Sequence, residues 1–257
     1  MKMDIEQINT IAMAAGAAIM EVYDNGDFSV DFKSDESPLT AADKAAHITI
    51  VEQLAKLTPD MPILSEEAVE AFSGANENGE YWLVDPLDGT KEFIKRNGEF
   101  TVNIALIRSG KPVLGVVYAP AIDTLYYAEE SAGAFKRVGR DQAQAISVES
   151  HSEDSPWRVV GSRSHASQET LDYLTQIEQY EMVPMGSSLK LCLVAEGRAD
   201  LYPRFGLTSL WDTAAAHAVV LASGGEVVTP EGKPLDYSNT EQMLNPYFIV
   251  RNPKDWQ

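Results

Sequence analysis

The spacing of apolar residues changes along the chain, and this change constrains the fold more than any other feature. Near the N-terminus apolar residues recur at helical spacing on one face, at Ile5, Ile8, Ala12, Ala15, Ile19 and Val22. A second helix is expected to begin at Thr40 and to end before Pro59. Its inward face is predicted to carry Ile48, Val51 and Leu54.

Short apolar runs bounded by turn residues follow, and they predict strands. The runs are Pro62–Leu64, Tyr81–Val84, Phe100–Ile107, Val113–Ala119 and Thr124–Ala128. Beyond a polar stretch at Ser147–Ser155, strands are expected to alternate with helices, which is typical of an α/β arrangement. The expected strands are Val159–Val160, Met182–Val183, Asp200–Tyr202, Glu226–Val228 and Phe248–Val250, and the expected helices are Gln168–Ile177, Ser187–Glu196 and Asp212–Ala222. We therefore predict one mixed α/β (α+β) domain over residues 1–257, with an α+β lobe at 1–152 and an α/β lobe at 153–257.

The charge balance limits the classes of partner. The chain has 39 acidic and 20 basic residues, which gives a formal net charge of −19. Such a surface repels bulk nucleic acid, so we expect no nucleic-acid polymer as a partner. A phosphorylated small molecule would also be repelled unless cations or local Lys and Arg side chains reversed the field. The charge therefore already indicates a metal.

Cysteine usage and hydropathy indicate the compartment. Cys192 is the single cysteine, which excludes an intrachain disulfide and a thiolate metal cluster and fits a reducing cytoplasm. The N-terminus does not resemble a secretory signal, and no segment approaches the ~18 consecutive apolar residues of a membrane span. We expect a cytoplasmic protein, with peripheral contact to the cytoplasmic face of the inner membrane left open.

Two aspartates directly follow an apolar run. The string W-L-V-D-P-L-D-G-T at 82–90 passes from a buried strand into a turn that carries Asp85 and Asp88. Pro86 fixes its own φ and Gly89 allows a sharp turn, so the two carboxylates can be held rigidly. Hard oxygen ligands of this kind suit Mg²⁺ or Mn²⁺ rather than Zn²⁺. The competing interpretation is a turn in which both aspartates only cap backbone amides, and it is the more frequent one for a bare D-x-x-D-G pattern.

Four further candidates each have an ordinary structural interpretation. Glu66 belongs to a pair of adjacent glutamates, and such pairs are usually solvated. Asp212 opens an alanine-rich helix, where a helix N-cap is the default expectation. Asp43 lies three residues after Thr40 in the pattern of a capping box. Lys33 is consistent with an ordinary surface lysine.

The combination of these motifs is far more specific than any one of them. The pair E-E at 66–67, D-P-L-D-G-T at 85–90 and W-D-T-A-A at 211–215 resemble the inositol monophosphatase superfamily in this order. The likeness spans almost the whole chain, from Lys33 and T-A-A-D at 40–43 onward. It implies a layered α-β-α-β-α sandwich of the metal-dependent sugar and inositol phosphatase type. It also implies an Mg²⁺-dependent hydrolase, with metal binding in the first lobe and substrate recognition in the second.

Several details are closer to the branch of this family that dephosphorylates 3′(2′),5′-bisphosphate nucleotides. They are K-E-F-I at 91–94, G-S-R-S-H at 161–165, G-S-S-L-K at 186–190 and L-Y-P-R at 201–204. Inositol-specific members usually have T-N or a similar pair at 91–92 and usually lack a basic residue matching Lys190. The resemblance therefore favours adenosine 3′,5′-bisphosphate (PAP), or its phosphosulfate PAPS, as substrate, with AMP or APS and phosphate as products. It further implies a role in sulfur metabolism and inhibition by lithium.

The same resemblance implies the metal ligands. Glu66, Asp85 and the carbonyl of Leu87 would hold one Mg²⁺, and Asp85, Asp88 and Asp212 a second, while a third, weaker ion near Glu66 and substitution by Mn²⁺ stay open. Four converging carboxylates would repel one another without cations, and metal ions offset that repulsion. One ion would activate a water, and the other would stabilise the departing ribose oxygen.

The remaining site residues are assigned from this resemblance and from their chemistry. Thr90, oriented by either Glu66 or Asp43, is expected to accept or position the proton of the attacking water. Lys190 and Arg204 are candidates for the second phosphate of the substrate. The competing interpretation is that Ser187 merely caps its helix and that Arg204 is a surface charge. The full set expected to touch the substrate is Glu66, Leu87, Asp88, Gly89, Thr90, Ser187, Lys190, Arg204 and Asp212.

Three other functions are weighed against this hypothesis. Haloacid-dehalogenase phosphatases share an Asp-Gly-Thr strand end, but their pattern is D-x-D-G-T, whereas two residues separate Asp85 from Asp88 here. An inositol or sugar phosphatase of the same superfamily is the main alternative. The third is a non-catalytic, acidic divalent-ion-binding protein, but the chain lacks an EF-hand pattern and ion storage would leave Thr90, Lys190 and Arg204 unexplained. A small phosphate ester is the expected partner, and both a monomer and a homodimer remain open.

Overall fold

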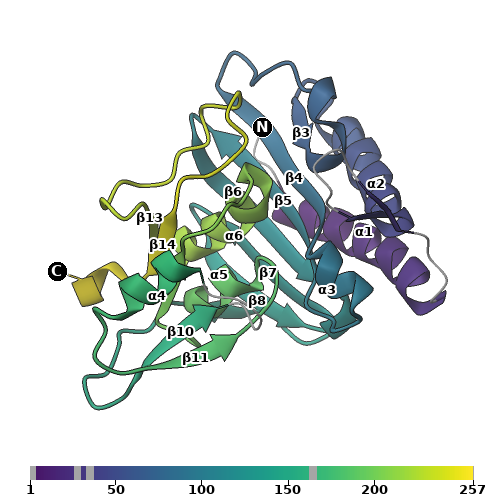
Figure 1. The fold of residues 1–257 in the computed structure, drawn as a ribbon. Coiled ribbons are helices and arrows are strands. Elements are labelled where there is room, and N and C mark those ends of the chain that lie inside the picture. Colours follow the sequence, from purple (N-terminus) through teal and green to yellow (C-terminus); the bar gives the residue numbers. More distant parts are fainter. Residues whose placement is uncertain (1–3, 26–29, 33–37, 162–166, 257) are drawn as a thin grey trace.

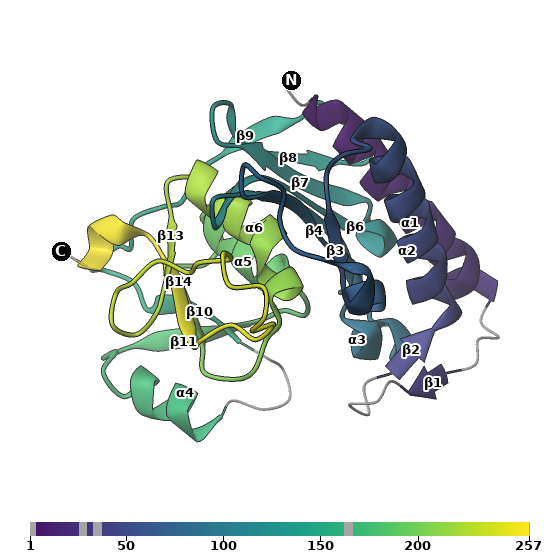
Figure 2. The same cartoon turned by 90° about the horizontal axis from the view of Figure 1, so that it is seen from above.

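The structure, a computed structural model, describes residues 4–25, 30–32, 38–161 and 167–256. Helical layers and sheets alternate in it (Figure 2). Helices α1 (Ile5–Asn25) and α2 (Ala41–Leu57) form the first layer and a seven-stranded sheet the second. Helices α5 (Leu189–Ala195) and α6 (Leu210–Ala222) form the third, a five-stranded sheet the fourth and α4 (Gln168–Leu174) the fifth. The predicted α-β-α-β-α sandwich is confirmed.

The seven-stranded sheet follows the chain order from β3 to β9. Its strands are β3 (Ile63–Ser65), β4 (Glu80–Asp88), β5 (Thr101–Arg108), β6 (Lys111–Ala119), β7 (Thr124–Glu129), β8 (Gly133–Val138) and β9 (Gln144–Ile146). β3 runs parallel to β4, and every later neighbouring pair is antiparallel. Because Ser65 at the end of β3 pairs with Val84, the residues that follow each of them lie at the same edge of the sheet.

The five-stranded sheet is mixed and follows the order β11-β10-β12-β14-β13. β10 (Trp157–Gly161) is parallel to β11 (Tyr180–Pro184) and β12 (Leu201–Arg204). β14 (Phe248–Arg251) is antiparallel to β12 and β13 (Glu226–Val228). Helices α4 and α5 form the crossovers between the parallel strands, on opposite faces of this sheet (Figures 1 and 2). The predicted alternation of strands and helices is confirmed, while the division into lobes at residue 152 stays a prediction.

Helix α2 buries a different face from the one predicted. Ala42, Ala46, Ile50 and Leu54 are fully buried, whereas Ile48 is 55% exposed. Residues four positions apart share a helix face, and a residue two positions away is rotated by about 200°. The prediction for Leu54 is confirmed and that for Ile48 is wrong. In α1 the predicted inward face is confirmed by its buried residues, which include Ile8, Ala12, Ala15 and Ile19.

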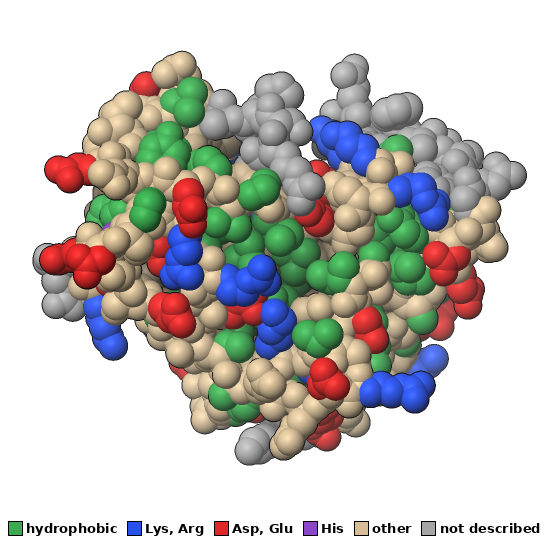
Figure 3. All heavy atoms as spheres, turned by 90° about the horizontal axis from the view of Figure 1, so that it is seen from below, with side chains coloured by type: hydrophobic (Ala, Val, Ile, Leu, Met, Phe, Trp, Pro, Cys, Tyr) green, Lys and Arg blue, Asp and Glu red, His purple; other side chains and the backbone are tan. Residues whose placement is uncertain are grey.

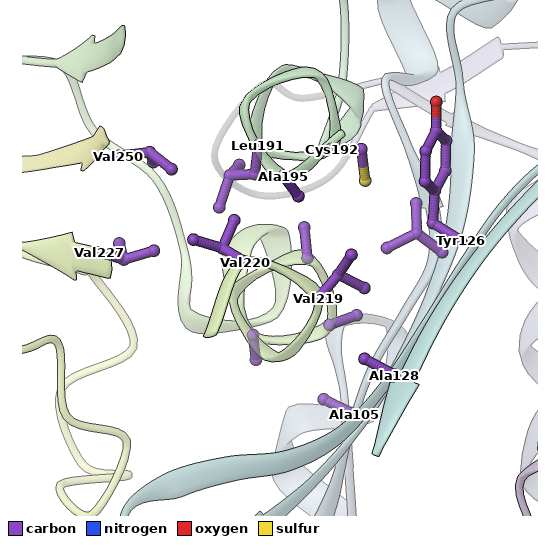
Figure 4. Packing of buried hydrophobic residues seen from close by; sticks show 14 of the residues in the cluster. Ala105, Tyr126, Ala128, Leu191, Cys192, Ala195, Val219, Val220, Val227 and Val250 are labelled. Carbon is purple, nitrogen blue, oxygen red and sulfur yellow. The ribbon is translucent and has the colours of Figure 1, made fainter. Parts of the chain in front are cut away.

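Helices α5 and α6 fill the space between the two sheets. Figure 4 shows side chains of both helices packed between the two sheets, with Ala105, Tyr126 and Ala128 on one side and Val227 and Val250 on the other. A Cβ added to Gly115 of β6 would lie 2.1 Å from the carbonyl oxygen of Ala215 in α6. The helix can therefore lie this close to the sheet only because residue 115 has no side chain.

The elements that the sequence did not predict are short. They are β1 (Val30–Phe32), β2 (Pro38–Thr40), α3 (Thr90–Ile94), β8, β9 and the 3₁₀ helices Glu66–Ala71, Pro120–Ile122 and Pro253–Trp256. Most of them span one or two turns or a few residues, so they carry too little periodicity to be recognised. Two of these elements, α3 and the 3₁₀ helix at Glu66–Ala71, carry candidate site residues.

Candidate active site

Strand β4 ends in the two aspartates of the D-P-L-D-G-T string. Its ladder with β5 pairs Asp85 with Asn103 and Asp88 with Thr101, and a bulge lies between the two pairs. Oδ1 of Asp85 accepts a hydrogen bond from the backbone nitrogen of Leu87 at 3.0 Å. Asp85 thus accepts a backbone amide, as expected if it only stabilised the turn. Its side chain is also held at the end of a buried strand.

Four carboxylates from three segments of the chain come together at this strand end. Glu66 opens the 3₁₀ helix after β3, Asp85 and Asp88 end β4, and Asp212 lies in the first turn of α6. Burial raises the pKa of Asp85 well above its usual value, and the charges of Glu66, Asp88 and Asp212 raise it further. Glu66 is therefore more than one member of a solvated glutamate pair, because its charge acts directly on the buried Asp85.

The other two aspartates also resist ionisation. Burial raises the pKa of Asp88 to about 6, although the charge of Lys190 and the backbone amide of Ser188 act in the opposite direction. Burial, followed by the charge of Asp88, raises the pKa of Asp212 to about 8. Near neutral pH the cluster therefore retains protons unless cations offset its charge.

The chemistry of this donor set fits a hard divalent cation. Its side-chain donors are carboxylate oxygens, which Mg²⁺ prefers, and burial limits competition from water. In the described ranges no three His, Cys, Asp or Glu side chains are gathered tightly enough to hold an ion as they stand. Backbone amides instead occupy part of the cluster, since the nitrogen of Ser188 donates to Oδ2 of Asp88 at 2.5 Å and that of Ser209 to Oδ2 of Asp212 at 2.9 Å. Ion binding would require small adjustments of these side chains.

Asp43 serves two neighbours with its two oxygens. Oδ2 accepts hydrogen bonds from the backbone nitrogen of Thr40 at 2.7 Å and from its Oγ1 at 2.6 Å, which forms the predicted capping box. Oδ1 accepts a hydrogen bond from Oγ1 of Thr90 at 3.3 Å. Asp43 is 1% exposed. The structural and the catalytic interpretations of this residue are therefore compatible.

Asp212 belongs to a second capping box rather than being the N-cap. Helix α6 begins at Leu210, and Ser209 is its N-cap residue. The expectation that Asp212 itself caps the helix is wrong because the helix starts two residues earlier than the alanine-rich segment suggests. At the third helical position, Asp212 points one oxygen back to the amide of Ser209, while the charge of Asp88 acts on its carboxylate.

Thr90 begins a short helix that faces the cluster. Gly89 adopts a φ of 89°, which is accessible to glycine at little cost and turns the chain from β4 into α3. Oγ1 of Thr90 also lies 3.4 Å from the carbonyl oxygen of Leu87, which is an alternative acceptor for its one proton. The structure thus brings together the side chain of Thr90 and the Leu87 carbonyl, both of which the sequence assigned to the site.

Two basic residues lie beside the acidic cluster. Burial lowers the pKa of Lys190, the charge of Asp88 raises it, and the charge of Arg204 lowers it again. Arg204 donates from Nη2 to the carbonyl oxygen of Leu207 at 3.0 Å, while its Nε is buried without a hydrogen-bond partner among the described residues. Figure 3 shows one face on which Lys and Arg side chains gather beside Asp and Glu side chains. The net charge of −19 is therefore not a uniform acidic surface.

Ser187 and Ser188 lie at the start of α5, between the acidic and the basic groups. Ser187 has a φ of 48°, and its Oγ accepts a hydrogen bond from the backbone nitrogen of Leu189 at 3.4 Å. This contact is long, and Ser187 is not the N-cap residue of α5, so the expectation that it caps its helix is wrong. Ser188 is the N-cap residue of α5, and no hydrogen bond from its side chain caps the helix.

The sequence did not single out the neighbours that hold the cluster. Thr101 and Asn103 lie opposite Asp88 and Asp85 in the β ladder, and Ser188 contacts both of them. A register drawn between the predicted strands would have placed Thr101 and Asn103 there. Lys33 and His165, considered from the sequence, lie outside the described residues. His217 is a buried core residue whose Nδ1 hydrogen-bonds to the hydroxyl of Tyr237 at 3.0 Å.

Comparisons with known proteins agree with this geometry. The family model described as the inositol monophosphatase family matches residues 2–253. The 3′(2′),5′-bisphosphate nucleotidase CysQ of Salmonella typhimurium is 54% identical, over 96% of this chain and 98% of its own. The crystal structure of CysQ from Bacteroides thetaiotaomicron is 43% identical with a TM-score of 0.79, covering 94% of both chains. Inositol monophosphatase from Anabaena is 27% identical with a TM-score of 0.74, covering 96% of this chain and 89% of its own.

Proposed function

The chain belongs to the inositol monophosphatase family, and we propose that within this family it removes the 3′-phosphate of adenosine 3′,5′-bisphosphate, giving AMP and phosphate. PAPS, which would give APS, is the second candidate substrate. Among the solved structures, CysQ from Bacteroides thetaiotaomicron is 43% identical to the chain, whereas the inositol monophosphatase from Anabaena is 27% identical. This difference favours the nucleotide over an inositol or sugar phosphate.

The single observation that carries the proposal is the juxtaposition of the two kinds of charge. A substrate with two phosphates needs a reaction centre that binds one phosphate and a separate cationic site that binds the other. The charge of Lys190 acts on Asp88 of the acidic cluster, and the charge of Arg204 acts on Lys190 and on Asp212. We assign the reacting phosphate to the cluster and the second phosphate to Lys190 and Arg204, with Ser187 as a further donor.

The family is metal-dependent, and the donor set fits Mg²⁺. We assign Glu66, Asp85 and the carbonyl of Leu87 to one ion and Asp85, Asp88 and Asp212 to a second, with a third ion and substitution by Mn²⁺ as further expectations. Bound Mg²⁺ supplies a water that is nucleophilic near neutral pH and offsets charge on the phosphoryl group.

The remaining steps fall to side chains and amides of this chain. Thr90 donates its own proton to Asp43, so the lone pairs of its Oγ1 can accept a hydrogen bond from the attacking water and orient it. The backbone amides of Gly89 and Thr90, at the start of α3, are candidate donors to the phosphate oxygens. Hydrolysis breaks the bond between phosphorus and the 3′-oxygen, and the ribose hydroxyl gains the proton that balances the reaction.

The substrate assignment is tested by direct competition among phosphate esters. PAP, inositol 1-phosphate and fructose 1,6-bisphosphate would be supplied at equal concentration with Mg²⁺, and phosphate release measured. We expect a clear preference for PAP. Preference for either sugar substrate would reject the nucleotidase assignment and leave the phosphatase assignment intact.

The metal-site assignment is tested by Asp88→Asn. The substitution removes a charge from the cluster but little volume, so the fold should persist while turnover is lost. Turnover near that of the wild type would reject Asp88 as a ligand. Tight Mg²⁺ binding without phosphate release from any phosphomonoester would instead favour the ion-binding protein considered above.

The remaining expectations concern the rival phosphatase class and the location and assembly of the protein. Family membership removes the haloacid-dehalogenase alternative. Within the described ranges, no helix is both long and apolar enough to span a bilayer. A cytoplasmic location, peripheral membrane contact and the choice between monomer and homodimer stay predictions.

A further inference from the structure

Three buried polar side chains form a chain of hydrogen bonds behind the acidic cluster. Thr101 is 0% exposed, and Asn103 and Ser188 are each 1% exposed. Oγ of Ser188 donates to Oδ1 of Asn103 at 2.7 Å and lies 2.8 Å from Oγ1 of Thr101. A serine hydroxyl has one proton, so Thr101 must be the donor to Ser188. The order of donation is therefore Thr101 to Ser188 to Asn103.

This chain reaches both aspartates of strand β4. The backbone nitrogen of Ser188 donates to Oδ2 of Asp88 at 2.5 Å. Asn103 lies directly opposite Asp85 in the β ladder, a relation in which Cβ atoms are about 5 Å apart and on the same face. The amide nitrogen of Asn103 is buried and has no hydrogen-bond partner among the described residues. Buried amides without a partner are costly, so a donor left in this state beside a carboxylate requires an explanation.

We propose that Thr101, Ser188 and Asn103 are positioning residues that hold Asp85 and Asp88 in the arrangement that binds Mg²⁺. Ser188 sets Asp88 through its backbone amide, and the hydroxyl of Thr101 fixes the orientation of Ser188. Ser188 in turn occupies the oxygen of Asn103, so the amide nitrogen of Asn103 is left as a donor beside the carboxylate of Asp85. The inference rests on the proposed metal site. Outer hydrogen-bond partners of this kind commonly determine metal affinity.

The test compares three threonine variants by Mg²⁺ titration calorimetry, without substrate. Thr101→Val removes the first donor but keeps the shape, and Thr101→Ser keeps the donor but removes a methyl group. Thr124→Val is the matched control, since Thr124 is a buried strand threonine whose hydroxyl donates only to the carbonyl of Ile122, at 3.1 Å. We expect Thr101→Val to weaken Mg²⁺ binding by about tenfold, while Thr101→Ser and Thr124→Val retain the wild-type affinity.

A fourth variant, Asn103→Leu, removes both the oxygen and the nitrogen of the side-chain amide at nearly constant volume. Because it takes away the acceptor for Ser188 and the donor for Asp85, its loss of Mg²⁺ affinity should exceed that of Thr101→Val. Thermal melts in EDTA report folding separately. If Asn103→Leu does not fold, the threonine comparison decides alone.

The outcomes separate this inference from the metal site on which it rests. If Asp88→Asn loses Mg²⁺ binding while Thr101→Val keeps it, the positioning role is rejected and the metal site stands. Equal losses in Thr101→Val and Thr124→Val also reject it, because the effect would then come from general destabilisation. Mg²⁺ binding unaffected by Asp88→Asn would reject the metal site itself.

Discussion

Helices α2 and α6 begin with the same local device but use it differently. Each has a hydroxyl residue at the N-cap, Thr40 or Ser209, and an aspartate at the third helical position whose Oδ2 accepts the N-cap amide. The other oxygen of Asp43 accepts a hydrogen bond from Thr90. Asp212 instead lies among carboxylates that raise its pKa to about 8.

The difference shows that a capping box settles neither for nor against a catalytic role. The cap uses one carboxylate oxygen and fixes the side chain, which leaves the rest of the group oriented by the helix start. The segment opposite then decides its chemistry: a threonine hydroxyl makes Asp43 a positioning acceptor, while three more acids make Asp212 a candidate metal ligand. An aspartate can therefore cap a helix and also take part in the candidate site.

The largest expected effect comes from Asp212→Asn. The amide oxygen can still accept the hydrogen bond of Ser209, so α6 should begin normally, but a charge that we assign to a metal is lost. We expect kcat/KM for PAP to fall by about a thousandfold, measured by phosphate release. Unchanged far-UV circular dichroism is the control, and turnover close to the wild-type value would contradict the ligand assignment.

Asp43→Asn should have a smaller effect of a different kind. An amide has only one acceptor oxygen, so it cannot serve both the cap and Thr90. We expect turnover to fall by about 10–100-fold, as for loss of a positioning partner, with calorimetric Mg²⁺ affinity retained. Thr40→Val is the matched comparison, because it weakens the cap by about 1 kcal/mol without removing the acceptor for Thr90. If both variants lose turnover equally, the cap rather than the Thr90 contact is what matters.

The pH dependence of stability tests the raised pKa of Asp212 in the metal-free protein. The pKa of Asp212 is raised from 3.8 to about 8, so between these values the native state holds a proton that the unfolded state has lost. The free energy of unfolding in EDTA should therefore fall as the pH rises through this window, and Asp88 adds to the fall up to about pH 6. Urea unfolding from pH 5 to 8.5 measures it. Asp212→Asn should flatten the fall, and a steady rise of stability with pH would refute the raised pKa.

The smallest effect is expected at the exposed face of α2. Ile48→Ala should change the free energy of unfolding by no more than about 0.5 kcal/mol, whereas Ile50→Ala should cost about 2–5 kcal/mol because it opens a cavity. Chemical denaturation of both variants provides the comparison. Equal costs would mean that α2 is rotated from the orientation that directs Asp43 inward.

Much of the fold follows from residues that are close together in the sequence. The inward face of α1, the strands around 81–128 and the later alternation were predictable because each element is long enough to show its period. The face of α2 was misjudged because Ile48 was counted as inward-facing, whereas the buried face carries Ala42 and Ala46, whose small side chains give a weak apolar signal. Strands β8 and β9 and helix α3 were missed because they are short or lack a regular apolar pattern.

The sequence by itself determined which side chains belong to the candidate site, because the order D-P-L-D-G-T then W-D-T-A-A is specific to one family. It also left each of these residues with a local alternative that no amount of local reasoning could remove. Only the tertiary structure decided that Asp43 meets Thr90 and that Asp212 joins Glu66 and the two aspartates of β4. It also decided that Thr101, Asn103 and Ser188 lie behind them. These contacts join residues 47 to 146 positions apart or depend on strand register, and neither distance nor register is encoded in any single segment.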